Sequence, residues 1–272
     1  MFVISISRGS LRIASKLAEG LKEKLGGKVI TREDVIKAAE KYSIHETGIK
    51  QDHILRQHVP GFWERYSKAR EHYLTCFKAA LIDFALEGSI IYHGNLAQLL
   101  MKDIPYALRV RVNAPQEDRI KELMKEENVS EEDAKARINT IDTQRKQWTQ
   151  FLYDVDVQNP ILFDMVLNFH KLTVQDAVEL VASEVAKKQF QPDEASIKKL
   201  KDVHLATVVH TYLMHSPDTY SLDLDIHADS DTGRVIVDKL PSEDRTAIEN
   251  IVRSVLKEVK EVKSVEMNKR MS

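Results

Sequence analysis

The stretch FVISISRGSLRIASKLAEGLKEKLGG, residues 2–27, decides the fold class. Its first part, 2–7, is short, largely apolar and rich in residues that favour extended structure, which predicts a buried strand. After the turn Arg8-Gly9-Ser10, apolar residues recur at helical spacing until Gly26-Gly27 ends the pattern. A strand that passes through one short turn into a helix is typical of the first unit of a parallel α/β sheet.

The same alternation continues to about residue 190. Four further strands are predicted, over 28–30, 89–93, 107–112 and 162–168. Helices are predicted between them, from the capping-box-like start at Thr31 and over 49–87, 116–155 and 173–188. The strands are nearly all apolar, as parallel strands covered on both faces should be. The sequence therefore predicts the α/β class, with a five-stranded parallel sheet flanked by helices.

After Gln191-Pro192-Asp193 the pattern changes to a small α+β module. In its first strand, apolar residues alternate with Asp223 and Asp225, so one face is expected to be buried and the other exposed. The chain is therefore divided into a domain over 1–190, a linker over 191–200 and a second domain over 201–272. The predicted elements of the module are a helix, two strands, a helix and a strand, over 194–215, 221–226, 234–237, 242–259 and 262–267.

The composition excludes several classes of protein. The chain has 272 residues, of which 43% are hydrophobic and 30% charged, and its formal net charge of -2 argues against a general nucleic-acid-binding surface. The single cysteine excludes an intramolecular disulfide framework, and the histidine spacing gives no reason to expect a metal site. No apolar run is long enough to span a bilayer, and no secretory leader is evident, so we expect a cytoplasmic protein.

The predicted helix over 49–87 carries Cys76 and a series of aromatic residues from Phe62 to Phe84. Cys76 lies among apolar helix positions and is expected in the core. The aromatic face is expected to be either core packing or the surface of a homodimer.

The turn between the first strand and the first helix is a candidate phosphate site. Free amides at the start of the helix, the positive end of the helix dipole and a nearby arginine would together favour an anion. The alternative is a simple turn with a capping serine. The candidate phosphate-binding residues are Arg8, Gly9, Ser10, Leu11 and Arg12.

Four segments together resemble the cytidylate-kinase-like family of nucleoside monophosphate kinases. They are ISISRGSLRIASKLAEGL (4–21), LRVRVNAPQEDRI (108–120), VSEEDAKARINTIDTQRKQW (129–148) and FDMVLNFHKLTVQDAVEL (163–180). The resemblance implies a P-loop kinase fold with an arm over the substrate and a helical lid. It also implies transfer of a phosphoryl group from ATP, with Mg²⁺, to a CMP-like acceptor.

The sequence departs from that family at two places. A working P-loop reads G-x-x-x-x-G-K-[ST], whereas here Arg8-Gly9-Ser10 alone joins the strand to the helix, without the lysine. His93-Gly94-Asn95 stands where these kinases usually have a Gly-Arg-Gly that holds the acceptor phosphate, so His93 and Asn95 are the substrate-binding candidates there. Each missing electrostatic donor costs roughly 10²–10³ in rate, so a degenerate P-loop predicts weak or absent phosphoryl transfer.

Other family positions are retained. Asp142-Thr143-Gln144-Arg145 matches the family's Asp-x-x-Arg, which implies that Asp142 holds a ribose and Arg145 a phosphate. Arg119 matches the arginine at the lid entrance, and Arg137 lies on the predicted lid; such arginines stabilise a transferring phosphoryl group. The alternative for Asp142 and Arg145 is a solvated ion pair, since residues three apart share a helix face.

The module over 201–268 resembles a BON domain, through the Leu222–Ile226 strand, the Thr232–Val237 hairpin and the closing Val262–Val265. Glu261 replaces the glycine that family usually carries. The resemblance implies a non-catalytic module that binds a ligand or a protein partner. The sequence therefore predicts a protein that binds a nucleotide or another phosphorylated ligand, or alternatively a non-catalytic sensor or interaction protein that acts through this module.

Overall fold

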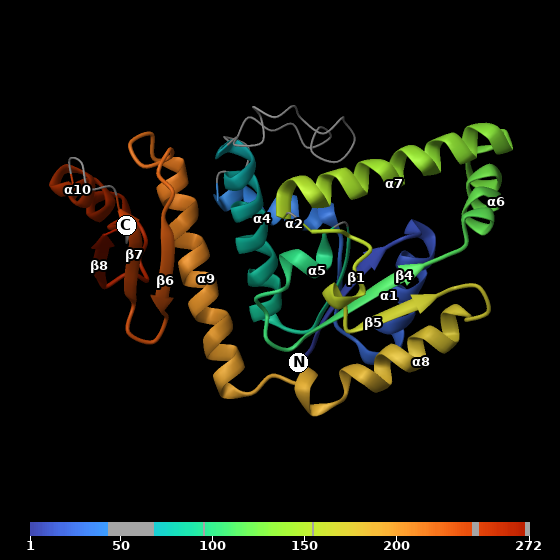
Figure 1. Cartoon of the computed structure of the whole chain (residues 1–272). Coiled ribbons are helices and arrows are strands. Elements are labelled where there is room, and N and C mark those ends of the chain that lie inside the picture. Colours follow the sequence, from blue (N-terminus) through green and yellow to red (C-terminus); the bar gives the residue numbers. More distant parts are fainter. Residues whose placement is uncertain (43–67, 95, 154, 241–244, 270–272) are drawn as a thin grey trace.

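The computed structural model describes residues 1–42, 68–94, 96–153, 155–240 and 245–269. Its first part is a five-stranded sheet in the order β2-β3-β1-β4-β5, and every neighbouring pair is parallel (Figure 1). The predicted fold class is confirmed. The strands are β1 Val3–Arg8, β2 Lys28–Ile30, β3 Ile90–Gly94, β4 Ala107–Asn113 and β5 Met165–Asn168.

Helices cover both faces of this sheet. On one face, α1 (Leu11–Leu25) and α8 (Val174–Val185) pack against Ile4 and Ile6 of the central strand β1. Apolar side chains of the opposite face pack against α2 (Arg32–Ala38), α4 (Lys68–Glu87) and α5 (Ala97–Leu100). Because both faces are covered, the central strand excludes water, as its apolar sequence predicts. The four-residue helix α5 is not predicted by the sequence, because it is too short for apolar residues to recur at helical spacing.

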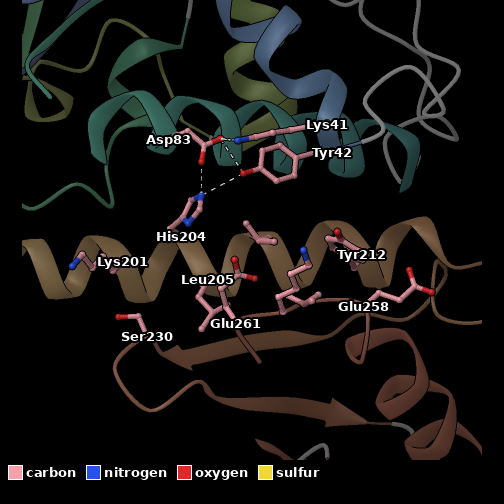
Figure 2. A pocket seen from close by; sticks show the side chains of 13 residues that line it. Lys41, Tyr42, Asp83, Lys201, His204, Leu205, Tyr212, Ser230, Glu258 and Glu261 are labelled. Atoms are coloured by element: carbon pink, nitrogen blue, oxygen red, sulfur yellow. Dashed lines mark hydrogen bonds and ion pairs between the residues drawn. The ribbon is translucent and has the colours of Figure 1, made fainter. Parts of the chain in front are cut away.

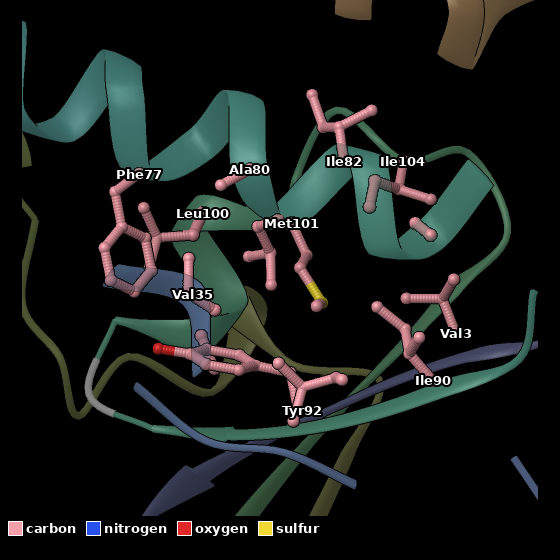
Figure 3. Packing of buried hydrophobic residues seen from close by; sticks show 14 of the residues in the cluster. Val3, Val35, Phe77, Ala80, Ile82, Ile90, Tyr92, Leu100, Met101 and Ile104 are labelled. Atoms are coloured by element: carbon pink, nitrogen blue, oxygen red, sulfur yellow. The ribbon is translucent and has the colours of Figure 1, made fainter. Parts of the chain in front are cut away.

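The face beneath α4 has a dense aromatic and aliphatic core (Figure 3). Phe77 stacks on Tyr73, with ring centroids 6.2 Å apart, and meets the buried Tyr92 of β3 edge to face. Cys76 is fully buried in the same cluster, which confirms its predicted place in the core. The described aromatic residues of this helix therefore serve core packing, whereas the predicted helical residues before 68 lie outside the described ranges.

Two helices, α6 (Gln116–Glu127) and α7 (Glu131–Tyr153), form an arm beside the sheet (Figure 1). The sequence predicts a continuous helical stretch over 116–155, but the chain breaks at Asn128, whose φ is 52°. Asparagine tolerates this left-handed conformation, and the Ser130 hydroxyl then accepts a hydrogen bond from the Asp133 amide to start α7. The two helices pack through a small core of their own around Ile120, Ala134 and Ile138.

The C-terminal module has the predicted order of elements. They are α9 Glu194–His215, β6 Asp225–Asp229, β7 Arg234–Leu240, α10 Arg245–Leu256 and β8 Ser264–Lys269. β6 pairs antiparallel with β7, and β7 pairs parallel with β8. The first strand begins at residue 225 rather than at the predicted 221, because pairing with β7 extends only from Asp225 to Asp229. The predicted alternation holds: Leu224 is buried, and Asp223 and Asp225 are exposed.

Helix α9 is shared between the two parts of the chain. Leu200 is buried in the core beneath α4, whereas Leu205, Val209 and Leu213 belong to the core of the module. Residues 194–200, which the sequence assigns both to the linker and to the start of the predicted helix over 194–215, form the first turns of this helix. Short 3-10 helices complete the described chain at Ala39–Tyr42 (η1), Pro160–Leu162 (η4) and Lys188–Phe190 (η5). Among the described helices, none is long and apolar enough to cross a membrane.

Candidate nucleotide-binding cleft

A cleft of about 540 Å³ opens at the carboxyl ends of β1 and β4, opposite α6 and α7. Ligands of parallel α/β sheets bind at this edge. Among the described residues that line it, four are cationic and one is a carboxylate: Arg111, Arg119, Arg145 and Lys146, with Asp142. This excess of positive charge favours an anionic ligand.

The turn between β1 and α1 forms one wall of the cleft and is as short as the sequence predicts. The Gly9 amide donates a hydrogen bond of 2.7 Å to the carbonyl of Val112 in β4. A Cβ at this position would lie 2.5 Å from that same oxygen, so only glycine fits. Ser10 caps the helix, because its hydroxyl accepts the Ile13 amide at 3.5 Å. Only Gly9 and Ser10 separate the strand from the helix.

The other predicted residues of this turn contribute in different ways. Arg8 ends β1 and Leu11 begins α1, so their backbones flank the turn. Arg12 does not line the cleft; it forms an ion pair of 3.3 Å with Glu126 of α6. This pair links α1 to the arm.

Three of the residues that the sequence singles out converge on the opposite wall. Arg119 holds the Asp142 carboxylate with two hydrogen bonds of 2.7 and 2.9 Å. Arg145 lies 3.7 Å from the same carboxylate. The Asp142 carboxylate, which remains partly exposed, therefore pairs with two arginines, Arg119 of α6 and Arg145 of its own helix α7, and not with Arg145 alone. The sequence does not reveal the pairing with Arg119, since Arg119 and Asp142 are 23 positions apart.

Sequence reasoning missed Arg111 and Lys146. Arg111 lies on β4, directly beside Ser7 of β1 in the strand register. Its Nε donates a 2.8 Å hydrogen bond to the Asn113 side chain, and Nη1 donates to the carbonyl of Val157. Burial lowers the pKa of this guanidinium, which Asp142 and Asp156 partly counter. The only signal in the sequence is a charged residue inside an otherwise apolar predicted strand.

The remaining predicted residues lie elsewhere. Arg137 is more than half exposed on α7, outside the cleft lining, and pairs with Glu127 of α6. His93 is half-buried on β3, beside Ile6 of β1, and does not line the cleft. Asn95 falls outside the described residues.

A family model adds independent information about this part of the chain. The model of the Cytidylate kinase-like family matches residues 3–171, which include the whole five-stranded sheet, both helices of the arm and the cleft. The chain belongs to the cytidylate kinase-like family. The module that follows lies outside the matched residues.

Individual relatives are more distant. The chain is 26% identical to the cytidylate kinase of Pyrococcus horikoshii over 123 residues, which are 45% of this chain and 62% of that protein. It is 28% identical to the cytidylate kinase of Staphylothermus marinus over 105 residues, 38% of this chain and 58% of that protein. The chain thus spans about three fifths of the length of these curated relatives.

A solved structure supports the fold. The crystal structure of an uncharacterized protein from Eubacterium ventriosum superposes with a TM-score of 0.51 at 15% identity, covering 68% of this chain and 97% of that one. At this identity the likeness concerns the fold alone.

In kinases of this kind the metal is Mg²⁺, and the described residues do not offer a site that would hold it. Mg²⁺ takes oxygen ligands and is usually held by one or two carboxylates. The carboxylate of this cleft, Asp142, is already bound by two arginines, and the Ser10 hydroxyl caps α1. The described part of the chain contains no group of three metal-ligating side chains. A metal would therefore have to arrive with the phosphates of a nucleotide.

A second cavity, of about 570 Å³, lies where α9 meets α4 and η1; Lys41, Tyr42 and Asp83 of its lining fall within the residues matched by the family model, and its other lining residues follow them. Figure 2 shows Lys41, Tyr42 and Asp83 converging with His204 of α9. The Asp83 carboxylate accepts hydrogen bonds from the Lys41 ammonium and the Tyr42 hydroxyl at 2.8 and 2.9 Å, and lies 2.8 Å from His204 Nε2. Burial, and then Asp83, raise the pKa of Tyr42. These polar groups bind one another and fasten α9 to the sheet domain.

Proposed function

We propose that this protein binds a nucleotide or another phosphorylated ligand in the cleft between β1, β4 and the arm. We further propose that it transfers a phosphoryl group from ATP to a CMP-like acceptor weakly or not at all. The observation that carries the proposal is the group of Arg111, Arg119, Arg145 and Lys146 at the ligand-binding edge of a kinase-like sheet. Family membership supports nucleotide binding independently.

The chemistry of the cleft suits a phosphate. Guanidinium groups bind phosphate oxygens through planar pairs of N–H donors, and the first turn of α1 adds amides and the positive end of a helix dipole. In this proposal Arg145 binds a phosphate of the ligand and Asp142 faces its ribose. Arg119, which holds Asp142 in place, would also reach a transferring phosphoryl group. His93 and Asn95 remain candidates for the acceptor side.

The β1–α1 turn supports weak transfer. Its two residues form a degenerate P-loop, without the encircling amides and the lysine that stabilise the phosphoryl charge. Removal of one such donor typically slows an enzyme by roughly 10²–10³, and at least two are missing here. Arg137 would assist transfer only if the arm moved, because it pairs with Glu127 outside the cleft.

The test is thermal unfolding with ATP, CMP, dCMP, cyclic nucleotides and inorganic phosphate, each with and without Mg²⁺. A ligand at 100 times its Kd adds about 2.7 kcal/mol of stability, a clear rise in Tm. We expect a shift with at least one phosphorylated ligand and little ADP formation in a coupled assay. Efficient, Mg²⁺-dependent ADP formation would contradict weak transfer.

If no nucleotide or phosphate raises the Tm, the proposal of a phosphate-binding cleft is wrong. The alternative function, a sensor or interaction protein acting through the C-terminal module, would then stand. One observation favours that alternative: α9 contributes to the cores of both the sheet domain and the BON-like module, through Leu200 in the first and Leu205 in the second. A conformational change in the sheet domain would therefore alter the packing of the C-terminal module, and the reverse.

A further inference from the structure

We propose that Arg111 binds the phosphate of the ligand and supplies the positive charge that the shortened β1–α1 turn lacks. This inference rests on the proposed function, since it adds Arg111 to the residues that bind the phosphate of that ligand. No part of the sequence motifs singles out Arg111; its place becomes evident only from strand pairing and the cleft.

The position of Arg111 follows from the register of the central strands. Arg111 of β4 stands directly opposite Ser7 of β1, and the next residue, Val112, accepts the hydrogen bond from the Gly9 amide. The side chain of Arg111 and the residues Ser7 and Gly9 line the same cleft. A cation on β4 thus lies beside the turn where the phosphate is expected, although the turn itself has no lysine.

The guanidinium is also held in place before any ligand arrives. Its Nε donates a hydrogen bond of 2.8 Å to the Asn113 side chain, and its Nη1 donates one to the Val157 carbonyl. The guanidinium carbon lies 5.5 Å from the centroid of the Phe163 ring. These two hydrogen bonds use two of the five N–H donors of an arginine, so donors remain for a ligand oxygen. A preorganised cation binds an anion without first losing side-chain entropy.

The other two arginines of the cleft each lie within ion-pair distance of a carboxylate, whereas among the described residues Arg111 does not. Arg119 forms two hydrogen bonds with Asp142, and Arg145 lies within ion-pair distance of the same carboxylate. Among the described residues, no carboxylate lies within ion-pair distance of Arg111; its protein partners are a neutral amide and a carbonyl. A half-buried cation without a carboxylate partner is a strong attractor for a phosphate.

The strand offers a matched control. Arg109 lies two residues earlier on the same side of β4 and does not line the cleft. Its backbone amide and its guanidinium group both donate hydrogen bonds to the Asp164 carboxylate, with distances of 2.8 to 3.1 Å. Arg109→Gln therefore removes an arginine of the same strand that does not line the cleft.

The experiment compares Kd values by isothermal titration for CMP against cytidine and for ADP against adenosine, in the full-length chain. For Arg111→Gln we expect the nucleotides to bind about 10- to 100-fold more weakly, the loss of one charged hydrogen-bonding group, while nucleoside binding stays unchanged. Arg109→Gln should bind all four ligands as the unaltered protein does. A change of less than threefold for both nucleotides in Arg111→Gln, or an equal loss for nucleotide and nucleoside, would overturn the assignment.

Chemical modification of the unaltered protein keeps the inference testable even if Arg111→Gln does not fold. Phenylglyoxal labels accessible arginines, and mass spectrometry locates the label. We expect saturating nucleotide, but not nucleoside, to protect Arg111; equal labelling with both would contradict the proposal. If the unaltered protein binds neither nucleotides nor inorganic phosphate, the proposed function itself fails, whereas normal nucleotide binding by Arg111→Gln overturns only the role of Arg111.

Discussion

At the scale of single residues, the cleft depends on how closely β1 approaches β4. Gly9 lets the two backbones meet, with its amide 2.7 Å from the Val112 carbonyl. The pairing of the same two strands places Arg111 next to Ser7, at the edge of the sheet where we propose that the phosphate binds. The absence of a side chain at Gly9 thus allows the contact between two neighbouring strands, one of which carries Arg111.

Gly9→Ala tests this close approach. The new Cβ would lie 2.5 Å from a backbone oxygen, so the strands must separate, at a cost of about 1–3 kcal/mol in the free energy of unfolding. We expect a clear fall in Tm by calorimetry. Gly88→Ala is the control, because nothing lies within 4 Å of a Cβ at Gly88. Equal Tm values for the two variants would show that the approach does not constrain the turn.

At the scale of elements, the contact between α4 and α9 attaches the module through polar groups. Asp83 of α4 faces Lys41 and Tyr42 of η1 and His204 of α9. Burial raises the pKa of Asp83, but hydrogen bonds from His204 and Lys41 lower it by more, so its pKa is below the usual value. A carboxyl whose pKa is lowered by folding stabilises the fold above its unfolded pKa of about 3.9 and loses this contribution as the pH falls through the folded value.

Asp83→Asn should therefore destabilise the protein in a pH-dependent way. At pH 7 we expect a loss of about 1–3 kcal/mol, because His204 and Lys41 lose their charged partner. The difference from the unaltered protein should shrink as the pH falls below about 4, where the natural carboxyl also becomes protonated. Urea unfolding at several pH values measures this, with the exposed Asp218→Asn as the control. A pH-independent difference would exclude the charge of Asp83 as its cause.

At the scale of the whole molecule, the core beneath α4 and the core of the C-terminal module are joined by one continuous helix, α9. Leu200 is buried in the first core and Val209 in the second, two and a half turns further along α9 at 3.6 residues per turn. Because a helix interior does not bend freely, loss of packing in either core changes the position of α9 and so disturbs packing in the other core. The chain is therefore expected to behave as one cooperative unit although it has two sheets.

This coupling predicts a single unfolding transition in calorimetry. Leu200→Ala and Val209→Ala should each cost about 2–4 kcal/mol, since both remove methyl groups from a packed core, and each should shift that single transition as a whole. Two separate transitions in the unaltered protein, with each variant moving only one of them, would show instead that the two parts unfold independently.

The sequence by itself determined the local features: the order of strands and helices, the parallel sheet, the short β1–α1 turn and the capping box at Thr31. It also indicated Arg119, Asp142 and Arg145, through a family resemblance. The spacing of apolar residues, the turns and the helix caps depend on residues only a few positions apart, so they can be predicted from the sequence. Only the tertiary structure decided that Asp142 is clamped by Arg119, that Arg111 faces the cleft and that α9 is shared, because each of these depends on which distant strands and helices become neighbours.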